Sequence, residues 1–434
     1  SNIINNGTLT IEHEGSLVQV DDNSKATNNG TIEVKKSIIG YDDPTDFSII
    51  GSPMTAETRD GVFNANLVTM NHITGNFVPH PDIATEDPGT ENFADEDGDN
   101  WDFNTTNIAS GVGYLVGGPS GGGDYTSTHT QGTLNNGIIS STAIYNGTQI
   151  GSPNMLSNPY ASAIDIHEFI SANTAIVDEV YFWEHITIPG STIDYPGHRV
   201  NNYEMGDISM RNVGGGLAAP NAGGGASIPS QFMASGQGFA IKAKTGGTVT
   251  FNNSMRVTGP NTGYRNNESI ERLYLNIINP TYQLHSSTLI AFTENATNGF
   301  ESNFDAERLA TPVSLYSVLE EMELAIQGRS EFNENHIIPI GFRTQVEESQ
   351  IYNISLGSIE GENLSEATVY LQDNLLNTTT NLSEENYTFT SNESNQKDRF
   401  VIVFTEEVLG TSDFIEASIS VYPNPTEDYI NIAS

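Results

Sequence analysis

"RLYLNI" at residues 272–277 places an apolar side chain at every second position, as a half-buried β-strand does. Similar short runs rich in β-branched and aromatic residues follow at residues 287–292 ("STLIAF"), 351–356 ("IYNISL") and 399–404 ("RFVIVF"). Strands at this spacing predict an antiparallel β-sandwich over residues 268–408. Asn-Gly, Gly-Gly and proline pairs separate comparable runs throughout the chain, so we expect an all-β protein.

Residues 1–44 contain a short repeat. "NNGTLTI" (residues 5–11) returns as "NNGTIEV" (residues 28–34), with an apolar run at residues 16–20 between them. Evenly spaced strands with Asn-Gly corners predict a small β-roll or the end of a β-solenoid. Such a stack needs a neighbour to cover its open end.

A second repeat runs through residues 45–267. Three segments recur in the same order, which predicts two related halves of one β-sandwich-like domain. The pairs are "IIGSP" (49–53) with "QIGSP" (149–153), "GVGYLV" (111–116) with "GQGFAI" (236–241), and "GTLNN" (132–136) with "GTVTFNN" (247–253).

A short helix is expected inside the second half. Residues 162–165 offer an N-terminal cap, after which Ile166, Phe169 and Ile170 fall on one helical face. Farther along, the apolar residues within 315–322 fit either a helical stripe or a pair of strands.

The composition excludes several classes of partner. Asp and Glu number 55 against 16 Lys and Arg, giving a net charge of -39, so we expect no binding to nucleic acid. The same carboxylates favour divalent cations, calcium in particular. Cysteine is absent, which excludes disulfides and thiolate metal sites. No apolar run reaches about eighteen residues, so no membrane insertion is expected, and residues 1–5 lack the features of a signal peptide.

The acidic run "DEDGDNWD" (residues 95–102) is the strongest candidate for a metal site. Alternate oxygen-bearing side chains in a tight loop can turn several carboxylates toward one hard cation, and Gly98 permits the bend. The run lacks the twelve-residue spacing and final Glu of an EF-hand, so a solvated acidic loop is the alternative. The predicted calcium ligands are Asp95, Asp97, Asp99 and Asp102.

Aromatic residues offer a second kind of site. Trp183 and Tyr181 are predicted to present stacking faces to a sugar ring, although aromatic residues of β domains belong more often to the core. Catalytic motifs are missing: the chain has no HExxH, no Gly-x-Ser-x-Gly elbow, and nothing that selects a carboxylate pair. We therefore predict no catalytic residues.

The last residues carry a recognisable motif. An acidic linker at residues 409–418 leads into "VYPNPT" (421–426) and "YINI" (429–432). This run resembles the opening of the type A C-terminal sorting domain of proteins exported by the type IX secretion system of Bacteroidota. By this resemblance residues 419–434 are the first strand of a truncated sorting domain. Its sorting signal would comprise Tyr422, Pro423, Asn424 and Pro425.

Other segments are similar to large surface proteins of the same phylum, and together they extend the resemblance over roughly residues 45–434. These segments are "MLSNPYASAIDIHEFI" (155–170), "VYFWEH" (180–185), "GQGFAIKA" (236–243), "FNNSMRV" (251–257) and "LAIQGR" (324–329). The resemblance implies export by the type IX translocon, handling by its sorting machinery, and display on the outer cell surface. It carries no catalytic site, since members share none.

The sequence therefore predicts a non-enzymatic secreted or cell-surface protein, either an adhesin or a structural component. Its expected partners outside the cell are a surface glycan or a neighbouring surface protein. A secreted glycan-binding or glycan-degrading protein is one alternative. Another is a subunit of a self-assembling surface fibre, because exposed strand edges can pair between molecules.

Overall fold

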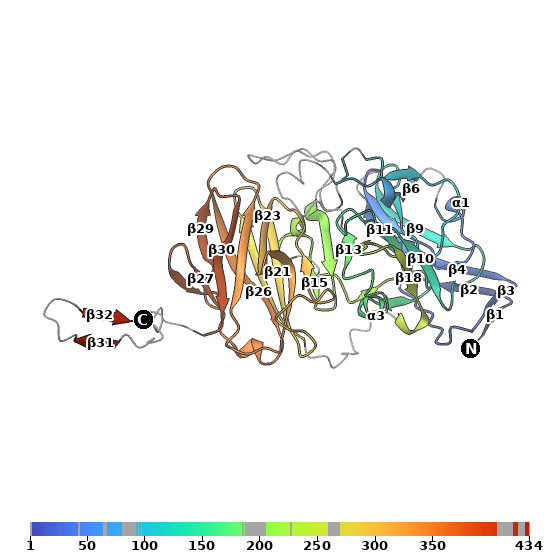
Figure 1. Cartoon of the computed structure of the whole chain (residues 1–434). Helices are drawn as coiled ribbons and strands as arrows, with labels where there is room; N and C mark the ends of the chain where they lie inside the picture. The colour runs from blue at the N-terminus through green and yellow to red at the C-terminus, as the bar shows by residue number, and fades with distance from the viewer. Residues whose placement is uncertain are drawn as a thin grey trace.

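The all-β prediction is confirmed. The computed structural model describes residues 2–41, 44–63, 67–79, 93, 95–96, 98–184, 186, 205–225, 228–258, 270–405, 420–423 and 430–433. Strands dominate these ranges, whose only α-helices are the short α1 (Arg59–Val62) and α3 (Ile166–Ala172). Figure 1 shows the N-terminal strands at one end of the body and the sheet formed by the last third of the body at the other. Short 3₁₀ turns are η1 (Thr74–Asn76), η2 (Met205–Asp207), η3 (Pro220–Gly225), η4 (Asn253–Met255) and η5 (Leu364–Glu366).

The first repeat stacks upon itself. Strand β1 (Ile3–Asn5) pairs in parallel with β3 (Ala26–Asn28), and β2 (Thr8–Ile11) pairs in parallel with β4 (Thr31–Tyr41). The register joins Asn5 to Asn28 and therefore follows the sequence repeat of 23 residues. Strand β4 also pairs antiparallel with β9 (Gly123–His129), so this N-terminal coil shares a sheet with the region that follows.

The middle of the chain forms two four-stranded arrangements with the same strand order. In each, the first strand lies beside the last, followed by the second and the third. The first half is β5 (Phe47–Ile50), β8 (Tyr114–Gly117), β6 (Thr69–His72) and β7 (Trp101–Phe103); the second is β11 (Pro153–Ser157), β17 (Gly238–Lys242), β13 (Val180–Trp183) and β14 (Ile208–Arg211), extended by β15 (Gly216–Leu217).

Register corrects one of the three sequence pairs. Ile50 lies opposite Tyr114 in the first half, and Leu156 lies opposite Phe239 in the second. Since Tyr114 and Phe239 occupy the same place in the repeated glycine-rich segment, Ile50 corresponds to Leu156 and not to Ile150. The true counterpart of residues 49–53 is therefore residues 155–159.

The two halves contact each other reciprocally. Ile50 forms an antiparallel β-bridge with Gln237, and the equivalent Leu156 forms one with Val112. Each half therefore pairs one strand end with a residue of the other half. The third sequence pair also meets, because the Asn253 side-chain amide donates to Asn136 Oδ1 over 2.9 Å. Next to this contact, β10 (Ile139–Ala143) pairs antiparallel with β18 (Gly247–Phe251). This exchange makes the halves one packed unit.

The expected helix is confirmed as α3. Asp165 caps it by accepting a hydrogen bond from the His167 amide over 2.8 Å. Ile166, Phe169 and Ile170 are fully buried, and the Phe169 ring stacks on a phenylalanine of β18. The strand that leads into the helix, β12 (Ala163–Asp165), pairs with β16 (Phe232–Met233) and β19 (Arg256–Val257).

Residues 270–405 fold as one nearly closed, barrel-like sheet, where two packed sheets were expected. Its pairs are antiparallel except for β21 with β24, which run in parallel. Residues 315–322 belong to a strand pair, which decides the open alternative between helix and strands. The strands are β20 (Glu271–Asn279), β21 (Leu284–Phe292), β22 (Ala306–Glu307), β23 (Val313–Leu319), β24 (Met322–Arg329), β25 (Ile338–Thr344), β26 (Gln350–Glu360), β27 (Tyr370–Asp373), β28 (Thr378–Asn381), β29 (Tyr387–Ser391) and β30 (Asn395–Val403).

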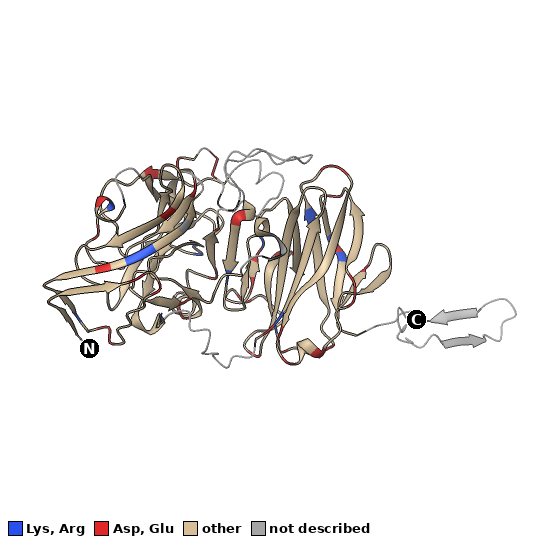
Figure 2. Ribbon diagram, turned by 180° about the vertical axis from the view of Figure 1, so that it is seen from behind, with Lys and Arg blue, Asp and Glu red and all other residues tan. Residues whose placement is uncertain are grey.

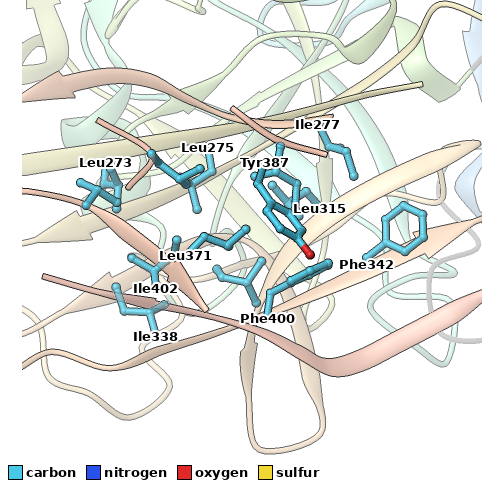
Figure 3. Close-up of a cluster of buried hydrophobic side chains, with 14 of the residues drawn as sticks. Leu273, Leu275, Ile277, Leu315, Ile338, Phe342, Leu371, Tyr387, Phe400 and Ile402 are labelled. Carbon is cyan, nitrogen blue, oxygen red and sulfur yellow. The ribbon is translucent and has the colours of Figure 1, made fainter. Parts of the chain in front are cut away.

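The interior of this barrel is filled by side chains. Leu273, Leu275 and Ile277 alternate into it from β20 and belong to one buried cluster with Phe342 of β25 and Phe400 of β30 (Figure 3). These side chains are fully buried, and each contributes about 1.5–3 kcal/mol through removal from water. The barrel therefore contains a packed core.

The C-terminal fragment forms a hairpin of its own. Strand β31 (Ser420–Pro423) pairs antiparallel with β32 (Ile430–Ala433), and the two make a separate two-stranded sheet. The expectation of one unpaired first strand is thus wrong, because residues 420–423 supply a partner for residues 430–433. Pairing between the two strands satisfies backbone groups that a lone strand would leave without partners.

Candidate functional site

Tyr181 and Trp183, the predicted sugar-binding residues, lie on strand β13. Tyr181 is only 1% exposed, with the Lys242 ammonium 5.0 Å from the centre of its ring and the Phe93 ring packed edge-on against it, the two ring centres 5.1 Å apart. A buried ring cannot stack on an external sugar, so the prediction is wrong for Tyr181. Trp183 is half-buried and packs against the cluster of buried apolar side chains to which Tyr181 belongs, which makes it chiefly a core residue.

Tyr181 belongs instead to a buried polar group. Its hydroxyl donates to Glu179 Oε1 over 2.5 Å, and Lys242 lies near both. Burial raises the pKa of the Glu179 carboxyl to about 7, against the opposing effect of the Lys242 charge. An acid with such a pKa can exchange a proton near neutrality, but its burial keeps substrates of any size away.

Strand periodicity explains why these groups meet. Tyr181 of β13 pairs with Ala240 of β17, and Lys242 lies two residues after Ala240. Glu179 directly precedes β13, two residues before Tyr181, and accepts the hydrogen bond from the Tyr181 hydroxyl. All four side chains therefore share one face of the sheet. The sequence signal for this group is the charged residue Lys242 at the end of the apolar run "GFAIK" (238–242), a signal that belongs to no catalytic or metal-binding motif.

A neighbouring ion pair connects this region to the barrel. Lys244 donates to Asp178 and, over 3.2 Å, to the Ser302 hydroxyl in the loop between β21 and β22. Burial raises the pKa of Asp178, while the hydrogen bond from Lys244 acts in the opposite direction. Through Lys244, Asp178 is connected to Ser302, so this ion pair links the duplicated region to the barrel region.

A small cavity lies at the same junction. It is lined by apolar side chains of β14 and β15 and by Arg308, Ser286 and Ser314 of the barrel region. Its volume is about 30 Å³. That volume suits one or two waters, since ligand pockets measure roughly 300–1,000 Å³.

The structure describes only part of the predicted calcium loop, residues 95–102. Asp95 accepts backbone hydrogen bonds from Val78 at 2.8 Å and Gly98 at 2.7 Å, one at each carboxylate oxygen. Asp99 and Asp102 are exposed, the latter on β7, and Asp97 lies outside the described residues. Within the ranges described, no group of three or more His, Asp or Glu side chains is arranged to hold a metal ion. Calcium binding therefore stays a prediction.

The predicted sorting signal lies in the C-terminal hairpin. Tyr422 and Pro423 belong to β31, where they face Asn431 and Ile430 of β32. Asn424 and Pro425 lie outside the described residues. In the part of the chain that the structure covers, none of the helices has the length and apolar character needed to span a membrane.

Comparison with known families gives one match. Residues 1–404 match the family described as "Domain of unknown function (DUF8693)". The chain belongs to this family. The match covers the N-terminal coil, the duplicated region and the barrel through β30, and it ends before the C-terminal hairpin. No curated protein and no solved structure matched the chain.

Proposed function

We propose that this DUF8693 chain is a rigid, non-enzymatic structural or adhesive module of a protein displayed outside the cell. One observation carries the proposal: a single apolar cluster joins the duplicated region to the barrel. Its buried members come from both sides of the junction. They are Tyr181, Met205, Ile208, Met210, Leu217 and Ala240 from the duplicated region, and Tyr274, Leu289, Ala306, Leu309, Ala325 and Ile326 from the barrel region.

The shared core makes the junction stiff. Protein interiors are packed as densely as organic crystals, so a continuous core transmits force without a hinge. Polar contacts reinforce it: Arg272 Nε donates to the Gly214 carbonyl over 2.6 Å, and the Val213 amide donates to the Asn303 carbonyl over 3.0 Å. Stiffness of this kind suits a module that presents a surface at a distance, and Figure 1 shows the strands on both sides of the junction.

The C-terminal hairpin supports the proposed route of export. The family match stops at residue 404, so the hairpin of residues 420–433 follows the family domain as a separate segment. A short separate segment is what a translocon needs to recognise without disturbing the folded body. We assign to it a sorting role through the resemblance of Tyr422 and Pro423 to the type IX motif, with the type IX translocon as partner and the outer cell surface as destination.

The export proposal is tested in a bacterium with an active type IX system. The intact gene and a version lacking residues 420–434 are expressed, and surface exposure is measured by protease accessibility and antibody labelling of whole cells. We expect exposure to be lost only on deletion, while a Leu376→Ser variant on an exposed barrel loop serves as the control. Equal exposure of the full and shortened chains would refute the sorting role.

The non-enzymatic role is tested with the purified chain. We expect no release of reducing ends from a panel of polysaccharides, and retention of a glycan or of whole cells on the immobilised protein if it is an adhesin. Measurable hydrolysis would overturn the proposal in favour of a glycan-degrading protein.

A further inference from the structure

Strands β1 and β2 are paired on one side only. Among the described strands, β1 pairs with β3 alone and β2 with β4 alone. The opposite edges of these two strands thus carry backbone donors and acceptors that no other described strand engages. They lie at the end of the body remote from the barrel (Figure 1).

Asparagine side chains hold the two coils in register. Asn5 donates to the Asn28 side-chain oxygen over 2.9 Å, and Asn29 donates to the Asn6 side-chain oxygen over the same distance. Each coil closes its corner in the same way, since Asn5 and Asn28 both accept from the glycine amide two residues later at 3.2 Å. Each asparagine pair offers donors and acceptors on both sides, so a further coil can bond to Asn5 and Asn6 identically.

The two ends of the stack differ in burial. Ile32 and Val34 of the inner coil are fully buried, beneath Met54 and Leu134 of the following region. Leu9, which lies opposite Ile32, is only half-buried although it belongs to the same cluster. The outer coil therefore leaves part of the apolar cross-section open.

Two equivalent glycines, Gly7 and Gly30, differ in the space around them and so show on which side a further coil could stack. A Cβ at Gly30 would lie 2.0 Å from the carbonyl oxygen of Gly7, so only glycine fits beneath the outer coil. A Cβ at the equivalent Gly7 would meet nothing within 4 Å, because no coil of the described residues lies above it. Gly7 is thus the position at which an added coil would demand glycine.

Charge also distinguishes this edge. Strands β1, β2 and β3 contain no charged residue, in a chain whose net charge is -39, and they are tan in Figure 2. Proteins commonly protect exposed edges with charged residues or proline, and here neither is present. The side chain of Ile4 on this outer strand is 66% exposed.

From these observations we infer that the β1–β2 edge is a docking surface for one further coil of the same repeat. The occupant is a strand, an Asn-Asn-Gly corner and a second strand, pairing in parallel with β1 and β2. Its asparagines bond to the side chains of Asn5 and Asn6, and its apolar residues cover Leu9. The inference deepens the proposed structural role and rests on it only for the biological setting.

The test fuses a copy of residues 1–23 ahead of Ser1 in the full chain, which preserves the repeat and gives the added coil a high local concentration. We expect amide hydrogen exchange at residues 8–11 to slow by at least about tenfold, as it does when an edge becomes an interior strand. Unchanged exchange would overturn the inference.

A Gly7→Ala variant provides the matched control. In the natural chain it should leave the melting temperature and the exchange rates unaltered, whereas in the fusion it should abolish the added protection. Equal protection in the two fusions would contradict the stacking geometry. Concentration-dependent dimerisation of the natural chain, with protection of residues 3–11, would show instead that a second copy occupies the edge. Neither result depends on export, so failure here is distinguishable from failure of the proposed function.

Discussion

The Gly51 amide donates to the carbonyl of Gly236 over 2.9 Å and joins the two halves of the duplicated region. The equivalent bond runs the other way, from the Ser157 amide to the Gly111 carbonyl at 3.1 Å. Reciprocity of this kind requires close approach of the backbones, which small residues permit. The halves therefore stabilise each other and should unfold together.

Gly238→Ala tests that coupling. A Cβ there would lie 2.2 Å from the Ile49 side chain and 2.5 Å from its backbone carbonyl, which cannot rotate away. We expect a loss of about 3 kcal/mol in the free energy of unfolding, at the upper end for overpacking, with one cooperative transition. Gly75→Ala, where a Cβ meets nothing within 4 Å, should change little in the same denaturant titration. Two separate transitions would argue against mutual stabilisation.

The sequence pattern predicted those strands, corners and helix ends that depend on residues close together in the chain. Alternation in residues 272–277 and the asparagine repeat specify strands and corners, and both are present as β20 and as the N-terminal coil. The cap at Asp165 predicted α3 for the same reason. These features depend on neighbours within a few residues.

The pairing of strands that are distant in the chain could not be predicted from local sequence pattern. Closure of the barrel depends on which strand edges meet across long loops, and nothing in one strand specifies its partner. The "GSP" pair misled because residues 149–152 form a turn in which the Gly151 amide donates to Thr148 Oγ1 at 3.0 Å, while residues 155–159 take the equivalent position. The burial of Glu179 and Tyr181 likewise follows from strands brought together only in the fold.

Arg256 should anchor the N-terminal coil to the duplicated region. Its guanidinium donates to the Leu17 carbonyl over 2.6 Å and to Ser162, Asn136 and Asn253, and it lies 4.7 Å above the Tyr160 ring. Burial lowers its pKa to about 10. Because a lysine cannot reproduce this fork of donors, Arg256→Lys should cost about 2–3 kcal/mol and accelerate hydrogen exchange in residues 2–36 first. Exchange that rises equally throughout the chain would reject the anchoring role.

The Asp373–Arg399 ion pair should stabilise the barrel. Asp373 Oδ2 accepts from Arg399 at 2.7 Å and from the Tyr387 hydroxyl at 2.6 Å, and its side chain is fully buried. Asp373→Asn leaves a buried guanidinium without a counter-charge, so we expect a loss of about 3–5 kcal/mol in chemical denaturation. Glu321→Gln serves as the control, since that carboxylate is 98% exposed although it lies 2.7 Å from Lys397. Its denaturation midpoint should match the parent's, and equal losses in both variants would contradict the importance of burial.

The Glu179 carboxyl should make stability depend on pH. Burial raises its folded-state pKa to about 7, above an unfolded value near 4.5, so the folded protein binds this proton more tightly than the unfolded chain does. The contribution is fully present below about pH 4.5, declines as pH rises, and is lost above about pH 7, with a total of up to about 3 kcal/mol. Asp305, whose pKa burial raises to about 6, acts in the same direction.

Glu179→Gln removes the titrating group, and the variant's free energy of unfolding should therefore fall less than the parent's between pH 5 and pH 7. Denaturant titrations at intervals across that range measure the slope, with Glu321→Gln as a carboxylate control that keeps the parent's slope. Identical slopes for Glu179→Gln and the parent would show that Glu179 stays charged in the folded protein, with Lys242 as its counter-ion.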